Sequence, residues 1–339
     1  MPETASSLLG EPAAPLAAAA AAAPAPEAVG RPPAAITGGL RRFSNADLVW
    51  SFRRSPVAVL ASAVFAMIVV ASALAPWIAP QNPHDLSQLF LDKAELPPIW
   101  SRDGEWPYLL GTDQQGRDVL SAILYGSRVS LMIGLGSVIV ALAIGVALGL
   151  VSGYLGGRVD NALMRIADTV LSIPTLLVAI LVSAVFRELL PPNLRDVFAA
   201  AILVMSIALT SWVQYARTIR ASTLVERRKD YVAAAQIIGV KPWAIMLRHI
   251  LPNTLTPIMV TATLNLGLAI LSEATLSFLG VGMPVTQPSL GTLIRIGNQY
   301  LFSGAWWVVV FPSLHLGLIV LAVNLIGDWL RDALNPRLR

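Results

Sequence analysis

The strongest constraint in this sequence is a series of long segments that carry no charged side chain. Five of them have 20 or more residues without Asp, Glu, Lys or Arg, namely 55–84, 129–157, 197–216, 249–272 and 296–327, and 169–186 is a shorter segment of the same kind. A transmembrane helix needs about 20 mostly apolar residues. Only 13% of the 339 residues are charged, about half of what a soluble domain carries. The sequence therefore predicts an all-α integral membrane protein.

The uncharged segments and their flanks accommodate six transmembrane helices, which we place at about 57–79, 128–151, 163–186, 197–216, 254–280 and 305–327. Six spans leave both termini on one side of the membrane, together with the loops 152–162 and 217–253. That side and its helix ends hold 17 of the 24 Lys and Arg residues. Because basic residues are enriched in cytoplasmic loops, we expect both termini and both loops to be cytoplasmic.

The chain divides into three regions by composition. Residues 1–40 are rich in Ala and Pro, and their first charges are acidic, whereas a secretory signal peptide begins with basic residues. We interpret this region as a disordered cytoplasmic tail. Residues 41–127 provide an anchor helix and a long external loop, and residues 128–339 form the membrane core with its cytoplasmic loop 217–253.

Several kinds of chemistry are excluded by what the sequence lacks. There are no cysteines, and the three histidines, His84, His249 and His315, show no metal-ligand spacing. Each of the three lysines follows a residue other than glycine, so the phosphate-binding motif GxxxxGK[ST] is absent. The net charge of +4 is accounted for by membrane orientation and indicates no nucleic-acid partner.

The cytoplasmic loop contains the unusual stretch YVAAAQIIGVKPWAIMLRHILPN at 231–253. Asp230 is suited to cap a helix that begins at Tyr231. The alanines Ala233, Ala234 and Ala235 favour helix and leave little side-chain bulk. Gly239 stands where a helix ends in a left-handed turn.

A second short helix is predicted after this turn. Lys241 and Pro242 begin it, since proline is tolerated at the first helical position. Leu251 and Pro252 end it, and Asn253 with Thr254 then caps the next span. Two interpretations remain open for the pair of helices: a small-residue surface that docks into a partner protein, or a connector that lies on the lipid headgroups.

A resemblance to a known family bears on this choice. The pattern A-A-x3-G-x9-H-x-L-P resembles the "EAA" loop of ABC-importer permeases, and its residues here are Ala234, Ala235, Gly239, His249, Leu251 and Pro252. The segments LGTDQQGRDVLSAILYGSRVSL, SGYLGGRVDNALMRIADTVLSIP, SEATLSFLGVG and NLIGDWLRDALNPRLR agree with it. Residues 45–339 resemble the C-type inner-membrane subunit of dipeptide, oligopeptide and nickel importers.

The resemblance implies a type I ABC importer permease fold in the bacterial inner membrane. It implies as partners a second, homologous permease, two ATPase subunits that hold ATP and Mg²⁺, and an extracytoplasmic substrate-binding protein. This chain would itself be no enzyme and would carry no cofactor. Peptides are the expected substrate, with a nickel chelate, glutathione or another small solute as alternatives. An ion-coupled carrier is the alternative from another class.

The resemblance also assigns a coupling role to the loop. The residues expected to couple transport to the ATPase are Ala233, Ala234, Ala235, Gly239, Lys241, Pro242, His249, Leu251 and Pro252. The family often has Glu where this chain has Ala233, so a charged contact from that position is impossible here. Glu226 or Asp230 could replace it.

Other residues within or beside the spans are candidates for the transport path. Glu273 lies in the fifth span, where an acid is costly, so it lines the path, relays a proton or holds helices together by hydrogen bonds. Asn265 and Asn324 are assigned to the path or its gate. Pro174 is expected to kink the third span.

Two clusters have open interpretations. Glycines 145, 149 and 153 form a small-residue face, which would contact either a partner permease or another helix of this chain. The charged residues Asp113, Arg117 and Asp118 are either a solvated external cluster or a contact for a binding protein.

Overall fold

The computed structural model describes residues 45–334 except 84 and 86–90. The tail expected at 1–40 lies outside these residues, and everything below concerns the unit Ser44–Arg339. Its described part is helical throughout, apart from turns, loops and one isolated bridge between Thr112 and Asp118. The predicted all-α class is confirmed.

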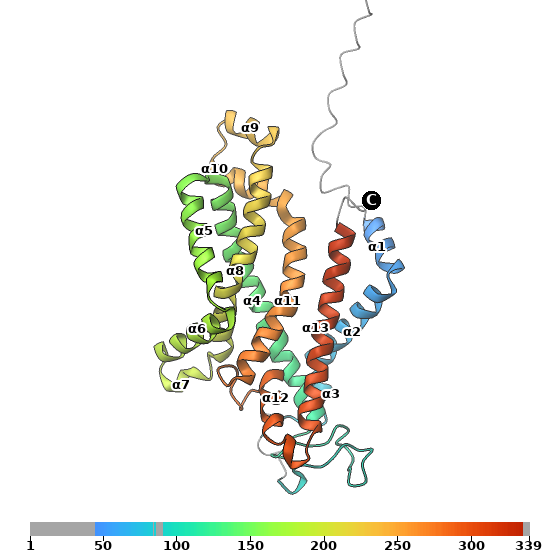
Figure 1. Cartoon of the computed structure of the whole chain (residues 1–339). Helices are drawn as coiled ribbons and strands as arrows, with labels where there is room; N and C mark the ends of the chain where they lie inside the picture. The colour runs from blue at the N-terminus through green and yellow to red at the C-terminus, as the bar shows by residue number, and fades with distance from the viewer. Residues whose placement is uncertain (1–44, 84, 86–90, 335–339) are drawn as a thin grey trace, which may run out of the picture. The chain divides into compact units, whose positions relative to one another are not determined.

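Five helical segments are long and apolar enough to cross a membrane (Figure 1). They are α2 (Pro56–Ala73), α4 (Val119–Leu155), α8 (Ala199–Glu226), the continuous segment Pro242–Phe278 that contains α11 (Leu255–Phe278), and α13 (Trp307–Leu334). A sixth is present if α5 (Gly157–Ser172) and α6 (Thr175–Leu189) are one bent span. The six predicted spans each correspond to one of these segments.

The third predicted span is broken rather than kinked. Helices α5 and α6 meet at 97°, and the break falls at Ile173 and Pro174. The ring of a proline disfavours helical geometry in the residue before it, and Ile173 is extended with φ −102° and ψ 137°. Pro174 therefore ends α5 and starts a new helix in another direction, where we had expected one helix over 163–186.

Two spans are much longer than their uncharged segments. Helix α4 begins at Val119 instead of 128, and α8 continues past 216 to Glu226. A charged side chain ends an apolar run but does not end a helix. The start of α4 is fixed instead by Asp118, whose carboxylate accepts the N–H of Ser121 at 2.8 Å.

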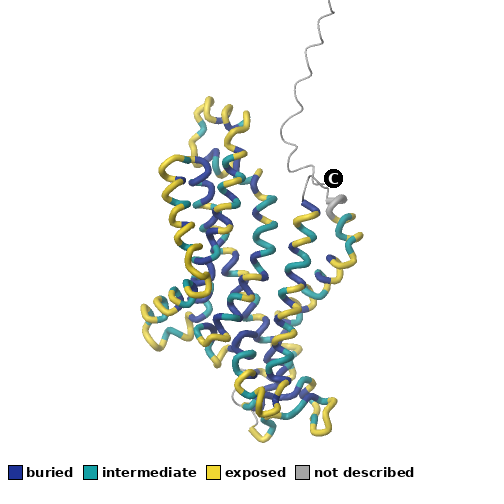
Figure 2. The backbone as a smooth tube through the Cα atoms, in the orientation of Figure 1, coloured by how far each residue is buried: buried dark blue, intermediate teal, exposed yellow. Residues whose placement is uncertain are grey.

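Helix α8 is the most buried of the five spanning segments. Within the most apolar 18 residues of α8, 61% of the stretch is buried. The corresponding share is 22–33% in the other four spanning segments. Figure 2 shows the buried positions gathered along the helices that face one another, with exposed positions on the outside. Many large apolar side chains of α2, α4 and α13 are exposed, as expected of surfaces that meet lipid or another membrane subunit.

The small-residue face of α4 packs inside this chain, against α8. A Cβ added at Gly149 would lie 2.6 Å from the carbonyl oxygen of Ala216, and one at Gly145 would lie 2.7 Å from that of Trp212. A Cβ at Gly153 would lie 2.7 Å from Cβ of Thr223. The glycines thus let the backbones of α4 and α8 approach closely. Of the two interpretations left open by the sequence, the structure supports contact with another helix of this chain rather than with a partner permease.

Shorter helices connect the spans. They are α1 (Asn45–Arg54), α3 (Ala75–Ile78), η3 (Leu91–Lys93), α7 (Pro192–Arg195), α9 (Asp230–Ile237), α10 (Pro242–Ala244), η4 (Ile245–Ile250), η5 (Leu251–Thr254), α12 (Leu290–Gln299) and η6 (Leu301–Ser303). Helices α9 and α10 lie at one end of the unit, and α3 and α12 lie at the other (Figure 1).

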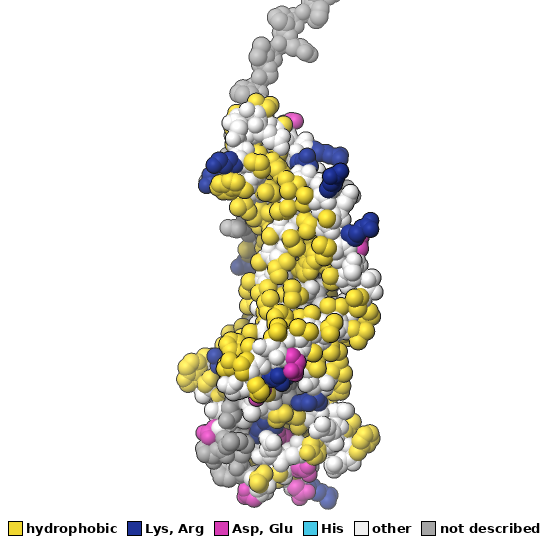
Figure 3. All heavy atoms as spheres, turned by 90° about the vertical axis from the view of Figure 1, so that its left-hand side faces the viewer, with side chains coloured by type: hydrophobic (Ala, Val, Ile, Leu, Met, Phe, Trp, Pro, Cys, Tyr) yellow, Lys and Arg dark blue, Asp and Glu magenta, His cyan; other side chains and the backbone are white. Residues whose placement is uncertain are grey.

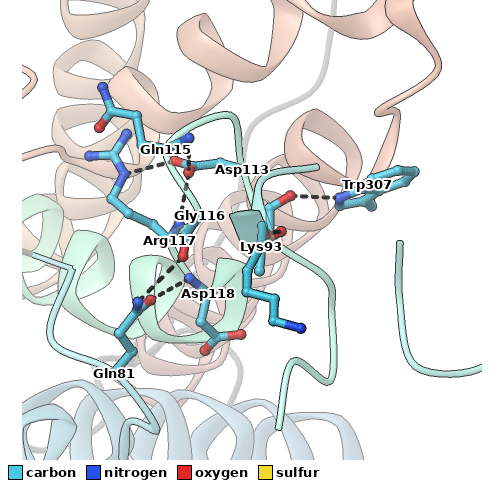
Figure 4. A network of polar contacts seen from close by, with 9 residues as sticks. Gln81, Lys93, Asp113, Gln115, Gly116, Arg117, Asp118 and Trp307 are labelled. Atoms are coloured by element: carbon cyan, nitrogen blue, oxygen red, sulfur yellow. Dashed lines mark hydrogen bonds and ion pairs between the residues drawn. The ribbon is translucent and has the colours of Figure 1, made fainter. Parts of the chain in front are cut away.

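The charged cluster before α4 is a buried structural network (Figure 4). Asp113, Arg117 and Asp118 are all buried, and Arg117 Nε donates to Asp113 Oδ2 at 2.7 Å. Gln81 reaches across to accept the N–H of Asp118 at 2.7 Å, and Trp307 Nε1 donates to the carbonyl of Thr112 at 3.0 Å. Both interpretations from the sequence are therefore wrong: the cluster is neither solvated nor an open contact surface, but fixes the external loop to α4 and α13.

Candidate functional site

The loop between α8 and α11 projects from one end of the unit as two short helices, α9 and α10 (Figure 1). Helix α9 begins at Asp230 itself, after Lys229 in extended geometry, and no side chain caps it. Asp230 is thus the first helical residue, whereas we had predicted it to be the cap. Its carboxylate still lies at the positive end of the helix dipole.

The turn after α9 is the one predicted from Gly239. This residue has φ +79°, in the left-handed region. The N–H of Gly239 donates to the carbonyl of Gln236 at 3.1 Å, and the N–H of Val240 donates to that of Ala235 at 3.0 Å. This pair of hydrogen bonds satisfies the last carbonyls of α9. Lys241 then precedes α10 in extended geometry, and Pro242 is its first residue, as predicted.

The predicted end of the second helix at Leu251 and Pro252 is wrong. Helix α10 continues through the π-helical turns of η4 and the tighter 3₁₀ turns of η5 directly into α11. A proline cannot donate to the carbonyl four residues back and crowds it. The change of helix type accommodates Pro252, while the side-chain Nδ2 of Asn253 donates to the carbonyl of His249 at 2.6 Å.

The nine residues assigned to coupling divide into two groups. Five are exposed at the end of the loop, namely Ala233, Ala234, Gly239, Lys241 and Pro242. Ala235 is buried, and His249, Leu251 and Pro252 are half-buried. The first group is available to a partner, and the second holds the loop on the spans.

The base of the loop is part of the membrane core. Val232, Ala235, Ile245 and Ile250 are buried in one apolar cluster with side chains from three spans, namely Leu150 and Tyr154 of α4, Ile219 of α8 and Ile258 of α11. A force applied to the loop is therefore passed to all three spans, because close-packed cores deform little.

The end of the loop exposes large apolar side chains that lie outside the nine residues assigned to coupling. Ile237 and Ile238 are 85% and 77% exposed, and Trp243 and Leu247 are more than half exposed. We call Ile237, Ile238, Gly239, Trp243 and Leu247 the coupling tip. No local signal in the sequence identifies this exposure, because it depends on which face of each short helix packs on the spans. Apolar side chains grouped on a projecting surface are typical of a protein contact.

A polar clamp fixes the start of α9. Tyr231 donates to Glu226 Oε2 at 2.6 Å, Lys229 donates to Glu226 Oε1 at 2.5 Å, and Asn253 donates to the Tyr231 oxygen at 3.3 Å. Burial and the neighbouring carboxylate raise the pKa of Tyr231, so its hydroxyl stays protonated as a donor. Glu226 is buried in this clamp and is unavailable to replace a loop glutamate, whereas Asp230 remains exposed.

A second ionic contact near the loop was also missed from the sequence. Asp160 of α5 accepts from Arg220 Nε and Nη2 of α8 at 2.5 and 2.6 Å, and from Ser152 of α4 at 2.5 Å. Asp160 and its two partners lie on three helices, and the contact joins 160 to 220, so local sequence could not reveal it. It ties α5 to the two helices that support the loop.

Glu273 is fully buried between α4, α11 and α12, toward the end opposite the coupling tip. Its two carboxylate oxygens accept from Ser130 and Ser277, each at 2.7 Å. The same hydroxyls accept the backbone N–H groups of Leu290 and Met283 at 3.2 and 3.1 Å. Of the three roles considered for Glu273, this geometry favours a hydrogen-bonded link between helices.

The other two residues assigned to the path are not grouped with Glu273. Asn265 lies two turns earlier in α11, about 12 Å along the helix axis. Asn324 of α13 is half-buried, and its amide lies beside Gly267, where an added Cβ would be 2.8 Å from the Asn324 oxygen. The structure therefore places the three candidates at separate points of the α11 packing surface. Among the described residues, no three His, Cys, Asp or Glu side chains are grouped to hold a metal ion.

Replacing Glu273 by glutamine is expected to lower stability without abolishing transport. One serine would face the new NH₂ group instead of an acceptor oxygen, at a cost of about 1–3 kcal/mol. Uptake per folded transporter should stay within about threefold of wild type, because the expected cost is to stability. The measurements are thermal unfolding in detergent and uptake normalised to folded protein. Loss of uptake with unchanged stability would instead indicate a proton relay.

The comparisons with known proteins agree with this arrangement. The family described as binding-protein-dependent transport system inner membrane component matches residues 145–339, and the N-terminal TM domain of oligopeptide transport permease C matches residues 46–98. The first match contains the projecting loop and Glu273.

Similar full-length proteins carry names from peptide transport. A di/tripeptide transport system permease protein of Pseudomonas aeruginosa is 41% identical, over 83% of this chain and 88% of that protein. Dipeptide transport system permease proteins of Haemophilus influenzae and Escherichia coli K12 are 39% and 42% identical, over 86% and 85% of this chain and 94% and 91% of theirs. The chain therefore belongs to the family of binding-protein-dependent transport system inner membrane components.

Proposed function

We propose that this chain is one permease subunit of an ATP-driven peptide importer and forms half of its translocation pathway. The observation that carries this proposal is the coupling tip, which exposes apolar side chains on a base buried with α4, α8 and α11. The names of the relatives support peptides as the substrate class. A nickel chelate, glutathione or another small solute is the alternative, and no feature of the described residues favours it.

In this mechanism the energy comes from two partner ATPase subunits, which hold ATP and Mg²⁺. Each permease inserts its coupling tip into one ATPase. When the ATPases close on ATP, the tip moves, and its buried base passes the motion to three spans at once. The two permeases then open toward the outside and receive the peptide from an extracytoplasmic binding protein. The exposed side chains of the coupling tip are apolar, which suits a loop that has Ala233 in place of glutamate.

The distribution of charge supports the proposed orientation. Figure 3 shows an apolar band between the two ends of the unit. The charged side chains toward the end that carries α9 and α10 are mostly basic, whereas acidic and basic ones are mixed at the other end. Such a band suits the hydrocarbon core of a bilayer, and basic residues are enriched on its cytoplasmic side. We accordingly place the coupling tip and both termini in the cytoplasm of a bacterial cell, with the spans in the inner membrane.

The proposal is tested by identifying what this chain binds. The chain would be tagged, crosslinked in native membranes and purified, and its partners identified by mass spectrometry. We expect a second permease, P-loop ATPases and a binding protein, and ATP-dependent peptide uptake by the reconstituted complex. Recovery of the chain alone or as a homo-oligomer, with crosslinking verified on a known complex, would contradict the proposal and favour an ion-coupled carrier.

A further inference from the structure

A pocket with both polar and apolar lining lies at the other end of the unit from the coupling tip. It has a volume of about 450 Å³ and is lined by Tyr125, Arg128, Val129, Met132, Thr286 and Gln287. The first four residues repeat at helical spacing on one face of α4, and the last two lie in the segment between α11 and α12. This volume is within the usual range of about 300–1,000 Å³ for small-molecule sites.

Arg128 brings a positive charge to the pocket. None of the ion pairs formed by the described residues includes Arg128. The uncharged run 129–157 begins directly after it, so the guanidinium lies at the edge of the apolar part of α4. A charge beside a low-dielectric region interacts more strongly than one in bulk water. Arginine is also always protonated and presents a planar fork that fits a carboxylate.

The remaining lining suits the rest of a short peptide. Gln287 contributes an amide group of the kind that pairs with a peptide bond, and the pocket is also lined by Tyr125 and Thr286. Val129 and Met132 provide apolar surface for a side chain. Methionine adapts to side chains of different shape, which a transporter of varied peptides requires. In the proposed orientation the pocket lies nearer the external end of the unit than the coupling tip does.

From these observations we infer that the pocket is a peptide subsite in which Arg128 binds the C-terminal carboxylate of the substrate. The inference rests on the proposed function, because it names the residue that binds the substrate within the proposed translocation pathway. The competing occupant is an acidic side chain of the partner permease, and the experiment separates the two. If the partner permease supplied the acid, the charge would be neutralised in the assembled transporter.

The absence of cysteine from the chain makes a direct test possible. Gln287→Cys introduces one thiol into the pocket of the complete transporter in membranes. Labelling of this chain is followed by its mass, with anionic and cationic methanethiosulfonate reagents. Each rate is divided by the rate of the same reagent with a small free thiol. We expect this ratio to be higher for the anionic reagent, and Arg128→Gln to abolish that preference. A dipeptide with a free carboxylate should slow labelling, whereas its C-terminal amide should not, and Arg128→Gln should remove the protection.

Uptake provides the second measurement. At subsaturating dipeptide, Arg128→Gln should lower uptake by about tenfold to a hundredfold, the loss expected for a charged hydrogen-bond pair. Arg128→Lys should retain a larger share, since the charge remains. Arg102→Gln, at an exposed arginine of the external loop, is the matched control and should leave uptake unchanged.

Three results would overturn the inference: no preference for the anionic reagent, equal protection by the dipeptide and its amide, or protection that persists in Arg128→Gln. The first would indicate an acidic partner from another subunit. A wild-type transporter that takes up no peptide with ATP would instead contradict the proposed function itself, so the two failures are distinguishable.

Discussion

Replacing Gly149 by leucine is expected to remove most of the folded protein from the membrane. The Cβ alone would lie 2.6 Å from the carbonyl oxygen of Ala216 and 2.8 Å from Cβ of Ile219. Both atoms belong to α8: one is a backbone oxygen and the other is bonded directly to the backbone. Neither is the flexible end of a side chain that could move aside. The rest of the leucine side chain would force α4 and α8 apart over several turns.

The expected cost follows from the place of α8 in the unit. Overpacking a core costs about 1–3 kcal/mol where side chains can adjust, and more where backbones must separate. Helix α8 is the most buried span, and its contacts with α4 support both the membrane core and the base of the loop. A loss of about 3 kcal/mol or more is a large part of the 5–15 kcal/mol that stabilises an ordinary domain.

The measurement is the amount of monodisperse protein extracted from membranes, together with its thermal unfolding temperature in detergent. Gly317→Leu is the matched control, because Gly317 lies in α13 and a Cβ there meets no atom within 4 Å. Its yield should equal that of wild type. If Gly149→Leu accumulates and unfolds like Gly317→Leu, the close approach of α4 and α8 does not exist in the protein.

The sequence predicted the spans well and their ends poorly, for a physical reason. A bilayer core excludes charge over a known length, so uncharged runs reveal where a helix crosses. Nothing comparable limits a helix once it leaves the bilayer. Val119 starts α4 because Asp118 caps it, and Glu226 ends α8 well inside the loop. The position of the break at Pro174 was predictable from proline chemistry, but its 97° angle depends on what α6 packs against.

The candidate site shows the same division between local and distant causes. Gly239 was identifiable because a left-handed turn favours glycine wherever it occurs. The exposure of Ile237 and Ile238 was not, since the outward face of a short helix is decided by which face packs on α4, α8 and α11. Glu273 was marked as costly in a membrane, but its acceptor role depends on Ser130, 143 residues away.

Replacing Gly239 by aspartate is expected to abolish uptake while leaving the permease folded in the membrane. Within this chain a Cβ at Gly239 would meet no atom within 4 Å, so the only internal cost is backbone strain at φ +79°. That strain is about 1–2 kcal/mol, and Asp tolerates the left-handed region better than most residues. The thermal unfolding temperature and the extracted amount should therefore change little.

The effect on uptake arises from the charge placed in the coupling tip. If the tip inserts into an ATPase, the new carboxylate is buried without a partner at a cost of about 3 kcal/mol or more, or about a hundredfold in affinity. We expect the ATPases to be lost during purification of the variant, and uptake to fall in parallel. Retention of the ATPases with normal uptake would show that the tip is not the docking surface.

Gly304→Asp separates strain from docking. Gly304 also has a left-handed φ, +96°, and a Cβ there also meets no atom within 4 Å, but it lies in the loop between η6 and α13 at the other end of the unit. The two variants add the same side chain to the same kind of backbone. Equal loss of uptake in both would mean that strain alone impairs transport. Loss confined to Gly239→Asp, with the ATPases retained by Gly304→Asp, would assign the effect to the coupling tip.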